Sequence, residues 1–193
     1  MKVFLDSVGC RLNQAELEQF AAKFKQYGYE IADSADEADL AIINTCSVTK
    51  EAASDSRGKI RNAARSGHTQ VIVTGCWSET EPEAASKMPG VTQVIRNHEK
   101  EQIASIVTGI PEQFTNPVSI KREILPGEHF RNRAFIKVQD GCDNYCTFCL
   151  TRLARGKSRS VAAETILQDI RAAENGGGKE IVLTGVNLGA WGM

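Results

Sequence analysis

Short apolar runs alternate with helical patterns over residues 2–109. The runs that are expected to form buried strands are Val3–Leu5, Leu40–Ile43, Val71–Val73 and Val94–Ile95. Continuous apolar runs separated by amphipathic helices are typical of parallel strands covered on both faces. The pattern therefore predicts a doubly wound α/β domain with a parallel sheet over residues 1–109.

Two helices are expected between the first three strands. Asn13, with Glu16 three residues later, resembles the capping box that begins a helix, and Gly28 is placed to end it. The apolar face of this helix consists of Leu17, Phe20, Phe24 and Tyr27. A second, longer helix is expected to follow Asn44 and to run toward Gly67.

Residues 110–132 separate this domain from a second unit. They include several prolines and show no clear periodicity, so we expect a linker. Residues 133–193 then predict a strand over Ala134–Val138, a loop with three cysteines, a helix near Ala162–Asn175 and a strand over Glu180–Thr184. A strand, a helix and a second strand in this order form one parallel crossover.

Composition and charge narrow the function classes. Of the 193 residues, 41% are apolar and 24% charged, as in globular proteins, and the net charge of −1 argues against binding nucleic acid by bulk charge alone. Basic residues outnumber acidic ones only after residue 109, so contact with a polyanion is expected there. The sequence shows neither a secretory signal nor a membrane-length apolar run, so we expect a cytoplasmic protein without a membrane partner. In that reducing compartment, the six cysteines are expected to be metal ligands or catalytic thiols.

Three of the cysteines share one short loop after a predicted strand. Cys142, Cys146 and Cys149 have the spacing C-x3-C-x2-C, and Phe148 precedes the last of them. Three thiolates can bind three irons of a 4Fe-4S cluster and leave the fourth iron open. The main alternative is a zinc site completed by His129, but structural zinc favours two paired-cysteine motifs, which the sequence lacks. A ferredoxin-like carrier would need a fourth ligand on this loop.

This loop resembles the cluster loop of the radical SAM superfamily, which follows the first strand of a partial (β/α) barrel. The resemblance implies that S-adenosylmethionine (SAM) binds the open iron and is cleaved by one electron to a deoxyadenosyl radical. The residues that it places at the cofactor are Phe148, Thr184, Gly185 and Asn187. A strand that ends in Thr–Gly is in itself a common strand-to-loop turn, and its position after the cysteine loop is what supports the assignment.

The other three cysteines are far apart in the sequence, but each follows a predicted parallel strand. They are Cys10, Cys46 and Cys76. The carboxyl ends of parallel strands meet at one edge, where helix N-termini stabilise anions. We therefore expect the three thiols to converge on a second cluster, although core packing explains any one of them alone.

Five segments together resemble the radical SAM methylthiotransferase family. The segments are Gly9–Gln14, Asn44–Cys46, Thr74–Cys76, Gly141–Cys149 and Ala154–Ser160, the last reading ARGKSRS. The resemblance implies that Cys10, Cys46 and Cys76 hold an auxiliary 4Fe-4S cluster whose open iron carries the sulfur to be inserted. The first and last segments look most similar to the branch that acts on threonylcarbamoyl-adenosine in tRNA. After Cys149 the chain reads Leu150–Leu153, where relatives usually carry a proline-containing apolar stretch.

The implied function is a transferase that inserts a methylthio group at carbon 2 of threonylcarbamoyl-adenosine next to the anticodon. The carbon–hydrogen bond has no useful acidity, so cofactors rather than a catalytic side chain are expected to do the chemistry. The implied partners are the tRNA anticodon stem-loop, an electron donor and a sulfur donor. The residues expected to contact tRNA phosphates or the SAM carboxylate are Asn13, Arg152, Arg155, Lys157 and Arg159. A solvated basic loop explains any single one of these cations equally well.

Three alternatives remain open at this stage. They are the isopentenyl-adenosine branch of the family, the branch that modifies a ribosomal protein, and an iron–sulfur redox or electron-transfer module. Relatives in the family continue through a longer partial barrel and a β-rich RNA-binding domain. We therefore expect residues 133–193 to be the beginning of a truncated radical SAM domain, and the 193 residues alone to lack turnover, because two strands cannot enclose a SAM pocket.

Overall fold

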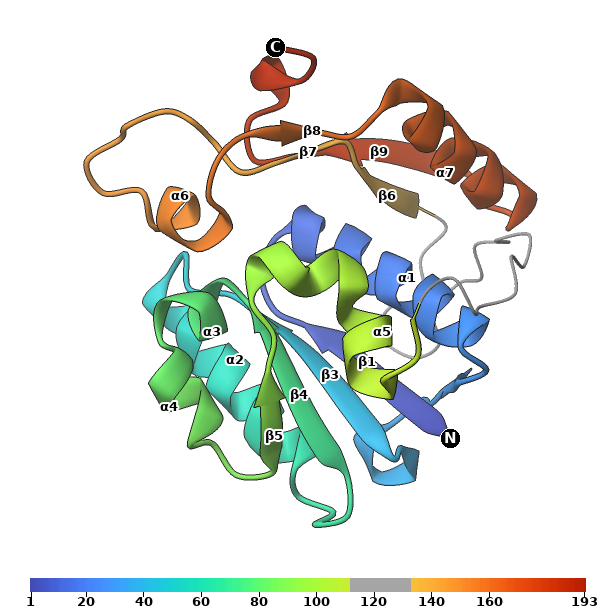
Figure 1. Ribbon diagram of the computed structural model, residues 1–193, viewed down its shortest axis with the longest axis vertical. Helices are drawn as coiled ribbons and strands as arrows, with labels where there is room; N and C mark the ends of the chain where they lie inside the picture. Colours follow the sequence, from blue (N-terminus) through green and yellow to red (C-terminus); the bar gives the residue numbers. More distant parts are fainter. Residues whose placement is uncertain (112–132) are drawn as a thin grey trace.

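The computed structural model describes residues 1–111 and 133–193 (Figure 1). The first unit is a five-stranded sheet in the order β2-β1-β3-β4-β5, in which every neighbouring pair is parallel. The strands are β1 (Lys2–Ser7), β2 (Glu30–Ile31), β3 (Leu40–Thr45), β4 (Gln70–Gly75) and β5 (Val91–Val94). Three of the four predicted strands are confirmed in place, whereas the fourth, predicted over Val94–Ile95, is found at Val91–Val94 and shares only Val94 with the prediction. The short strand β2 was not predicted.

Helices cover both faces of this sheet (Figure 1). One face packs against α1 (Arg11–Gln26) and α5 (Ile103–Thr108). The other face packs against α2 (Lys50–Ala63), α3 (Cys76–Thr80) and α4 (Pro82–Ser86). The short 3-10 helices η1 (Ala35–Glu37) and η2 (Asn97–Gln102) lie in the connections. The doubly wound α/β class is therefore confirmed.

The start of α1 corrects one expectation. The helix begins at Arg11 with Cys10 as its N-cap, which makes no side-chain capping hydrogen bond. Asn13 and Glu16 therefore lie inside the helix, where both are buried, and they do not form a capping box. Their polar groups are used elsewhere, because they face a cluster of buried charges described below.

The second unit is smaller. Strands β6 (Arg133–Lys137) and β9 (Glu180–Thr184) are parallel and are connected through α7 (Ala163–Asn175), as the pattern predicted. Helix α6 (Leu150–Arg155) and the antiparallel pair β7 (Gln139–Asp140) and β8 (Arg159–Ser160) were not predicted. A 3-10 helix, η5 (Leu188–Ala190), follows β9. Most of the predicted linker lies outside the described residues.

The two units are in direct contact. Helix α1 packs against β6, and the short helix α6 packs against α3 and η2. Figure 1 accordingly shows the second unit lying across α1, with α6 above α2 and α3. Among the described residues, we find no helix with the length and apolar character needed to cross a membrane.

Candidate cluster and cofactor sites

The first three cysteines lie at the carboxyl edge of the five-stranded sheet. Cys46 and Cys76 directly follow β3 and β4 and are buried, whereas Cys10, at the start of α1, is exposed. Gly9 has a φ of 99°, and a β-carbon at this position would lie 2.6 Å from the Sγ atom of Cys46. Because residue 9 has no side chain, the loop that carries Cys10 can approach Cys46 closely.

Neighbouring groups fix the backbone of Cys46 and act on the thiol of Cys76. The amide of Cys46 donates to the Ser56 hydroxyl at 2.9 Å, and that hydroxyl lies 3.1 Å from the Cys46 carbonyl oxygen. Burial raises the pKa of the Cys76 thiol, while the charges of Arg155 and Lys100 act in the opposite direction and lower it. Cys46 also raises the pKa of Cys76, so these two thiols are close enough to interact. Two cations therefore act on the cysteine edge.

The donor chemistry of this edge suits an iron–sulfur cluster. Within residues 1–111 and 133–193, no three His, Cys, Asp or Glu side chains stand close enough together to hold a metal ion in their present arrangement. All six cysteines are nevertheless free thiols, the ligands that iron–sulfur clusters use. Two buried hydroxyls near these cysteines find no hydrogen-bond partner among the described residues. They belong to Ser47, which follows Cys46, and to Thr74, two residues before Cys76. Such hydroxyls can donate to a bound anionic group.

The second three cysteines lie on the loop between β7 and α6. Cys142 is buried, Cys149 is half-buried and Cys146 is exposed. Gly141 has a φ of 68°, and a β-carbon there would lie 1.9 Å from the carbonyl oxygen of Lys157. The amide of Cys142 also donates to the carbonyl oxygen of Gly156 at 3.0 Å. The backbone of the ARGKSRS segment is therefore seated directly on the cysteine loop.

Gln139 joins three segments around this loop, although no sequence motif marks it. Its side chain is fully buried. The amide nitrogen donates to the carbonyl oxygen of Gly141 at 2.6 Å and to the hydroxyl of Ser158 at 3.0 Å. Its amide oxygen accepts from the backbone N–H of Asn187 at 2.8 Å. One side chain thus holds together the cysteine loop, the ARGKSRS segment and the turn after β9.

The residues expected at SAM are only partly brought together. Thr184 is buried at the end of β9, and the side-chain nitrogen of Asn187 lies 3.9 Å from the Sγ atom of Cys142. Gly185 lies between them in the sequence and packs against the buried side chain of Gln139. Phe148, in contrast, is 95% exposed, so its ring does not lie against these residues.

The predicted tRNA-contacting cations occupy two different environments. Lys157 and Arg159 are exposed, and Arg152 is half-buried with its guanidinium carbon 3.8 Å from the ring centroid of Tyr145. Arg155 is buried and makes ion pairs inside the protein. Arg159 also lies 3.6 Å from Asp140, but like Lys157 it is exposed and can reach a phosphate, whereas Arg155 is enclosed by its protein partners.

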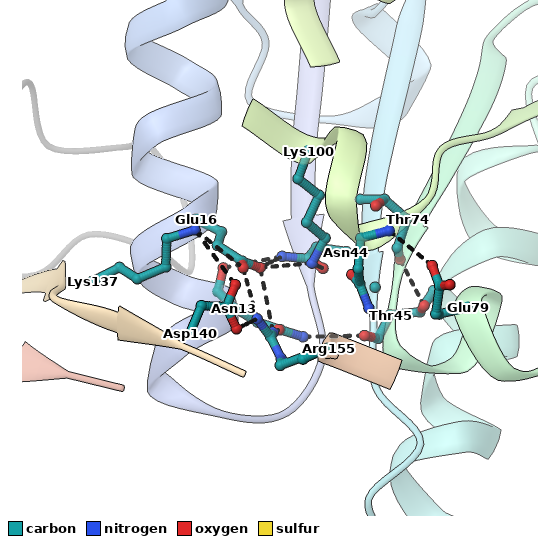
Figure 2. A network of polar contacts seen from close by, with 12 residues as sticks. Asn13, Glu16, Asn44, Thr45, Thr74, Glu79, Lys100, Lys137, Asp140 and Arg155 are labelled. Carbon is teal, nitrogen blue, oxygen red and sulfur yellow. Dashed lines mark hydrogen bonds and ion pairs between the residues drawn. The ribbon is translucent and has the colours of Figure 1, made fainter. Parts of the chain in front are cut away.

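Glu16 is the centre of a buried polar network between the two units (Figure 2). Its carboxylate accepts hydrogen bonds from Lys100 at 2.7 Å, from Arg155 at 2.8 Å and from the side-chain amide of Asn44 at 2.9 Å. Burial alone would raise the pKa of Glu16, but Lys100, Arg155 and Lys137 together lower it well below its ordinary value. The carboxylate is therefore ionised at neutral pH.

Arg155 carries this network into the second unit (Figure 2). Its guanidinium donates to the side-chain oxygen of Asn13 at 2.6 Å and to Asp140 at 3.0 Å, in addition to Glu16. Lys137 lies 3.8 Å from Glu16 and 3.7 Å from Asp140. Asn13 and Arg155, both expected to contact substrate, are thus bound to each other in this structure.

Comparisons with known proteins agree with this arrangement. Residues 2–96 match the model of the uncharacterized protein family UPF0004, and residues 136–190 match the radical SAM superfamily. The chain is 36% identical to the threonylcarbamoyladenosine tRNA methylthiotransferase MtaB of Aquifex aeolicus, covering 100% of this chain and 49% of that protein. It is 37% identical to the Bacillus subtilis protein of the same name, and the alignment covers 98% of this chain and 44% of that protein. The tRNA-2-methylthio-N(6)-dimethylallyladenosine synthase of Syntrophus aciditrophicus is 29% identical, with coverages of 98% and 44%.

The chain thus spans about half the length of the curated relatives that it matches. A solved structure of the radical SAM methyltransferase TsrM from Kitasatospora setae is similar in fold, with a TM-score of 0.65 and 14% sequence identity. The match covers 98% of this chain and 48% of that one. Both family models match in the order of the two structural units, and the curated methylthiotransferases align along nearly the whole chain. Along nearly its whole length, the chain is similar to methylthiotransferases, and its second unit matches the radical SAM superfamily.

Proposed function

We propose that this chain is part of a tRNA-modifying enzyme that inserts a methylthio group at carbon 2 of threonylcarbamoyl-adenosine next to the anticodon. The observation that carries the proposal is the presence of two separate sets of three free cysteines, one in each unit. These sets occur in a chain that is 34–38% identical to five threonylcarbamoyladenosine tRNA methylthiotransferases.

Each set of cysteines would hold one 4Fe-4S cluster. Cys142, Cys146 and Cys149 would hold the cluster that binds SAM, and the set at the sheet edge would hold the cluster that carries sulfur. When bound, the clusters and SAM supply one-electron cleavage chemistry and the sulfur atom, which side chains do not offer. Thr184, Gly185 and Asn187 would line the SAM site.

The protein's own residues would position the cofactors and bind the tRNA. Gln139 fixes the cysteine loop relative to Asn187 through its buried hydrogen bonds, so the SAM side of the site is built before the cofactor binds. Three cations between residues 152 and 159 would donate to phosphates of the tRNA anticodon stem-loop, because all three are at least partly exposed. They are Arg152, Lys157 and Arg159. An electron donor and a sulfur donor complete the reaction.

A second candidate substrate is isopentenyl-adenosine in tRNA. The dimethylallyladenosine synthase of Syntrophus aciditrophicus aligns with 98% of the chain at 29% identity, so this branch shares the same frame. The cysteine sets are common to both proposals, and only the modified nucleoside distinguishes them.

Mass spectrometry of nucleosides tests the substrate. We expect tRNA from cells that lack the gene to lose 2-methylthio-threonylcarbamoyl-adenosine, and the gene to restore it. Replacement of Cys10, Cys46 and Cys76 by Ala in the gene should prevent restoration but leave SAM cleavage by the full-length enzyme intact. An unchanged level of that nucleoside in the deletion strain contradicts the substrate. Absence of 5′-deoxyadenosine from reduced enzyme with SAM would instead favour an electron-transfer module.

A further inference from the structure

The buried network between the units contains more positive than negative charge. Two carboxylates, Glu16 and Asp140, face three buried cations, Lys100, Lys137 and Arg155, and each of these residues is at most 7% exposed. A fourth cation, the exposed Arg159, lies 3.6 Å from Asp140. Buried charge is costly unless it is compensated, so a cluster with an excess cation favours an anion at its border. The buried cations therefore outnumber the buried carboxylates of this network, although each cation contacts at least one carboxylate.

The cysteine edge of the first unit lies at this border. Lys100 and Arg155 are the two cations whose charges act on Cys76. Helix α6, which ends at Arg155, packs against α3, which begins at Cys76. The side chain of Asn97 donates to the carbonyl oxygen of Ala154 at 2.6 Å, which fixes the end of α6 against the first unit. Arg155 is thus held at the end of a helix that is packed against the helix beginning at Cys76.

The proposed function identifies an anion that could lie at this border, the cluster bound by Cys10, Cys46 and Cys76. A 4Fe-4S cluster bound by three thiolates is negatively charged overall, and nearby charge is one of the factors that set the reduction potential of such a cluster. A guanidinium that is also bound to Glu16 and Asp140 has little freedom to move away. The positive charge is therefore preorganised at the edge before any cluster is bound.

We propose that Arg155 is a positioning residue that docks the second unit on the cysteine edge of the first through Glu16 and, with Lys100, compensates the negative charge of a cluster on Cys10, Cys46 and Cys76. The docking part stands on the contacts alone. The charge-compensating part rests on the proposed function, because that function identifies the anion.

Hydrogen exchange of the 193-residue chain tests the docking. In Arg155→Gln, we expect the amides of residues 150–155 to exchange at least tenfold faster, while those of β3 and β4 stay protected, because a buried ion pair is lost only at the contact between units. Arg171→Gln is the matched control, since it removes an exposed cation from α7 of the same unit. Exchange in α6 of folded Arg155→Gln that equals that of the control overturns the docking.

The reduction potential tests the charge compensation. Protein with Cys142, Cys146 and Cys149 replaced by Ala should carry only the cluster of the first unit. Adding Arg155→Gln should shift its reduction equilibrium about tenfold toward the oxidised form, which for one electron lowers the midpoint by about 59 mV. Arg155→Lys retains the charge and should shift the equilibrium less than threefold. An unshifted midpoint in folded Arg155→Gln overturns this part of the proposal.

Two outcomes separate this inference from the proposed function. If the protein with the three Ala replacements binds no iron, the cluster assignment of the first unit fails, whereas hydrogen exchange still decides the docking. If circular dichroism shows that Arg155→Gln does not fold, Arg155→Lys takes its place, because it loses the forked geometry and retains the charge. Faster exchange in α6 of Arg155→Lys, with its midpoint near that of the parent, supports the proposal, and unchanged exchange contradicts it.

Discussion

The two units of the molecule are held together by different forces. The first unit buries an apolar cluster on each face of its sheet, and these clusters include twelve and eight buried residues. The described part of the second unit buries a cluster of three residues, Ile136, Val138 and Ile166. In the same unit, Leu167 and Leu183 are about half exposed. The first unit therefore has a core of its own, whereas the second depends more on its neighbour.

The contact between the units has the opposite character. Glu16, Lys100 and Arg155 are buried there, and their carboxylate, ammonium and guanidinium groups are paired in a setting that excludes water. Such a network adds less net stability than apolar packing of the same volume, but it tolerates few alternative arrangements. The difference suggests that apolar burial stabilises the first unit and that charge pairing fixes where the second unit sits.

The largest expected effect comes from the core of the first unit. Phe24 is fully buried and packs edge-on against Tyr29, with ring centroids 5.6 Å apart. Phe24→Ala should lower the free energy of unfolding by about 3–5 kcal/mol, and both units should lose structure together. Urea denaturation measures the change, and Val48→Ala, at an exposed position, should stay within about 0.5 kcal/mol of the parent. A loss below about 1 kcal/mol for Phe24→Ala would show that this core is not what stabilises the chain.

Removal of the charge at the centre of the network should have the next largest effect. Glu16→Gln leaves Lys100 buried without its carboxylate and Arg155 with Asp140 alone, and we expect a loss of about 3 kcal/mol in the same denaturation measurement. Lys59→Gln is a control that breaks a partly exposed ion pair with Asp6. Equal losses in the two variants would contradict the importance of burial.

The same carboxylate predicts a dependence on pH. The pKa of Glu16 is well below its ordinary value in the folded protein, so its contribution is present above the ordinary pKa of about 4.3 and is lost as the pH falls toward the folded pKa. The parent should therefore lose more stability than Glu16→Gln as the pH falls below about 4.3, and the two should respond alike above it. Parallel stability curves for the two proteins below this pH would rule out a depressed pKa.

A smaller and more local effect is expected in the second unit. Ile166, on α7, belongs to the three-residue apolar cluster of this unit. Ile166→Ala should lower the free energy of unfolding by about 2 kcal/mol. Hydrogen exchange should rise in β6 and α7 but not in β3 or β4. Leu167→Ala, at the exposed neighbouring position, is the matched control and should leave exchange unchanged. A rise that spreads equally through β3 and β4 would mean that the two units unfold as one.

The smallest effect is expected at the surface of the first unit. The Lys59 ammonium lies 2.6 Å from Asp6, but both side chains are partly exposed. Lys59→Ala should therefore cost about 0.5 kcal/mol, and added salt should reduce the difference from the parent. A salt-independent loss above about 2 kcal/mol would place this pair with the buried network instead.

Periodicity predicted most of the fold because the responsible interactions are local. The buried strands of the first unit and the segment β6–α7–β9 follow from apolar runs, glycines and helix faces in the sequence. Helix α6 and the strands β7 and β8 did not follow, since they are short and owe their conformation to contacts made by Gly141 and Gln139. Strand β5 begins three residues before the predicted start because its residues are at most partly buried and form no continuous apolar run that would mark it in the sequence.

Cysteine spacing and strand ends identified the candidate ligands, but not the charges around them. Glu16 and Asn13 had the spacing of a cap, and only the packing of β6 and α6 on α1 shows that they face inward. Lys100, Lys137 and Asp140 are ordinary charged residues in the sequence. Their role arises from partners far away in the sequence, such as Glu16, which lies 84 positions before Lys100, and no local pattern encodes such a pair.

Iron content per chain tests the central claim, that the two cysteine sets bind separate clusters, most directly. Anaerobically reconstituted protein should contain about eight irons, because two 4Fe-4S clusters are proposed. Replacement of Cys142, Cys146 and Cys149 by Ala should leave about four, and replacement of Cys10, Cys46 and Cys76 should also leave about four. Each variant should retain the folded circular dichroism spectrum of the parent. A folded variant that keeps all of its iron, or one that loses both clusters, would contradict two independent cluster sites.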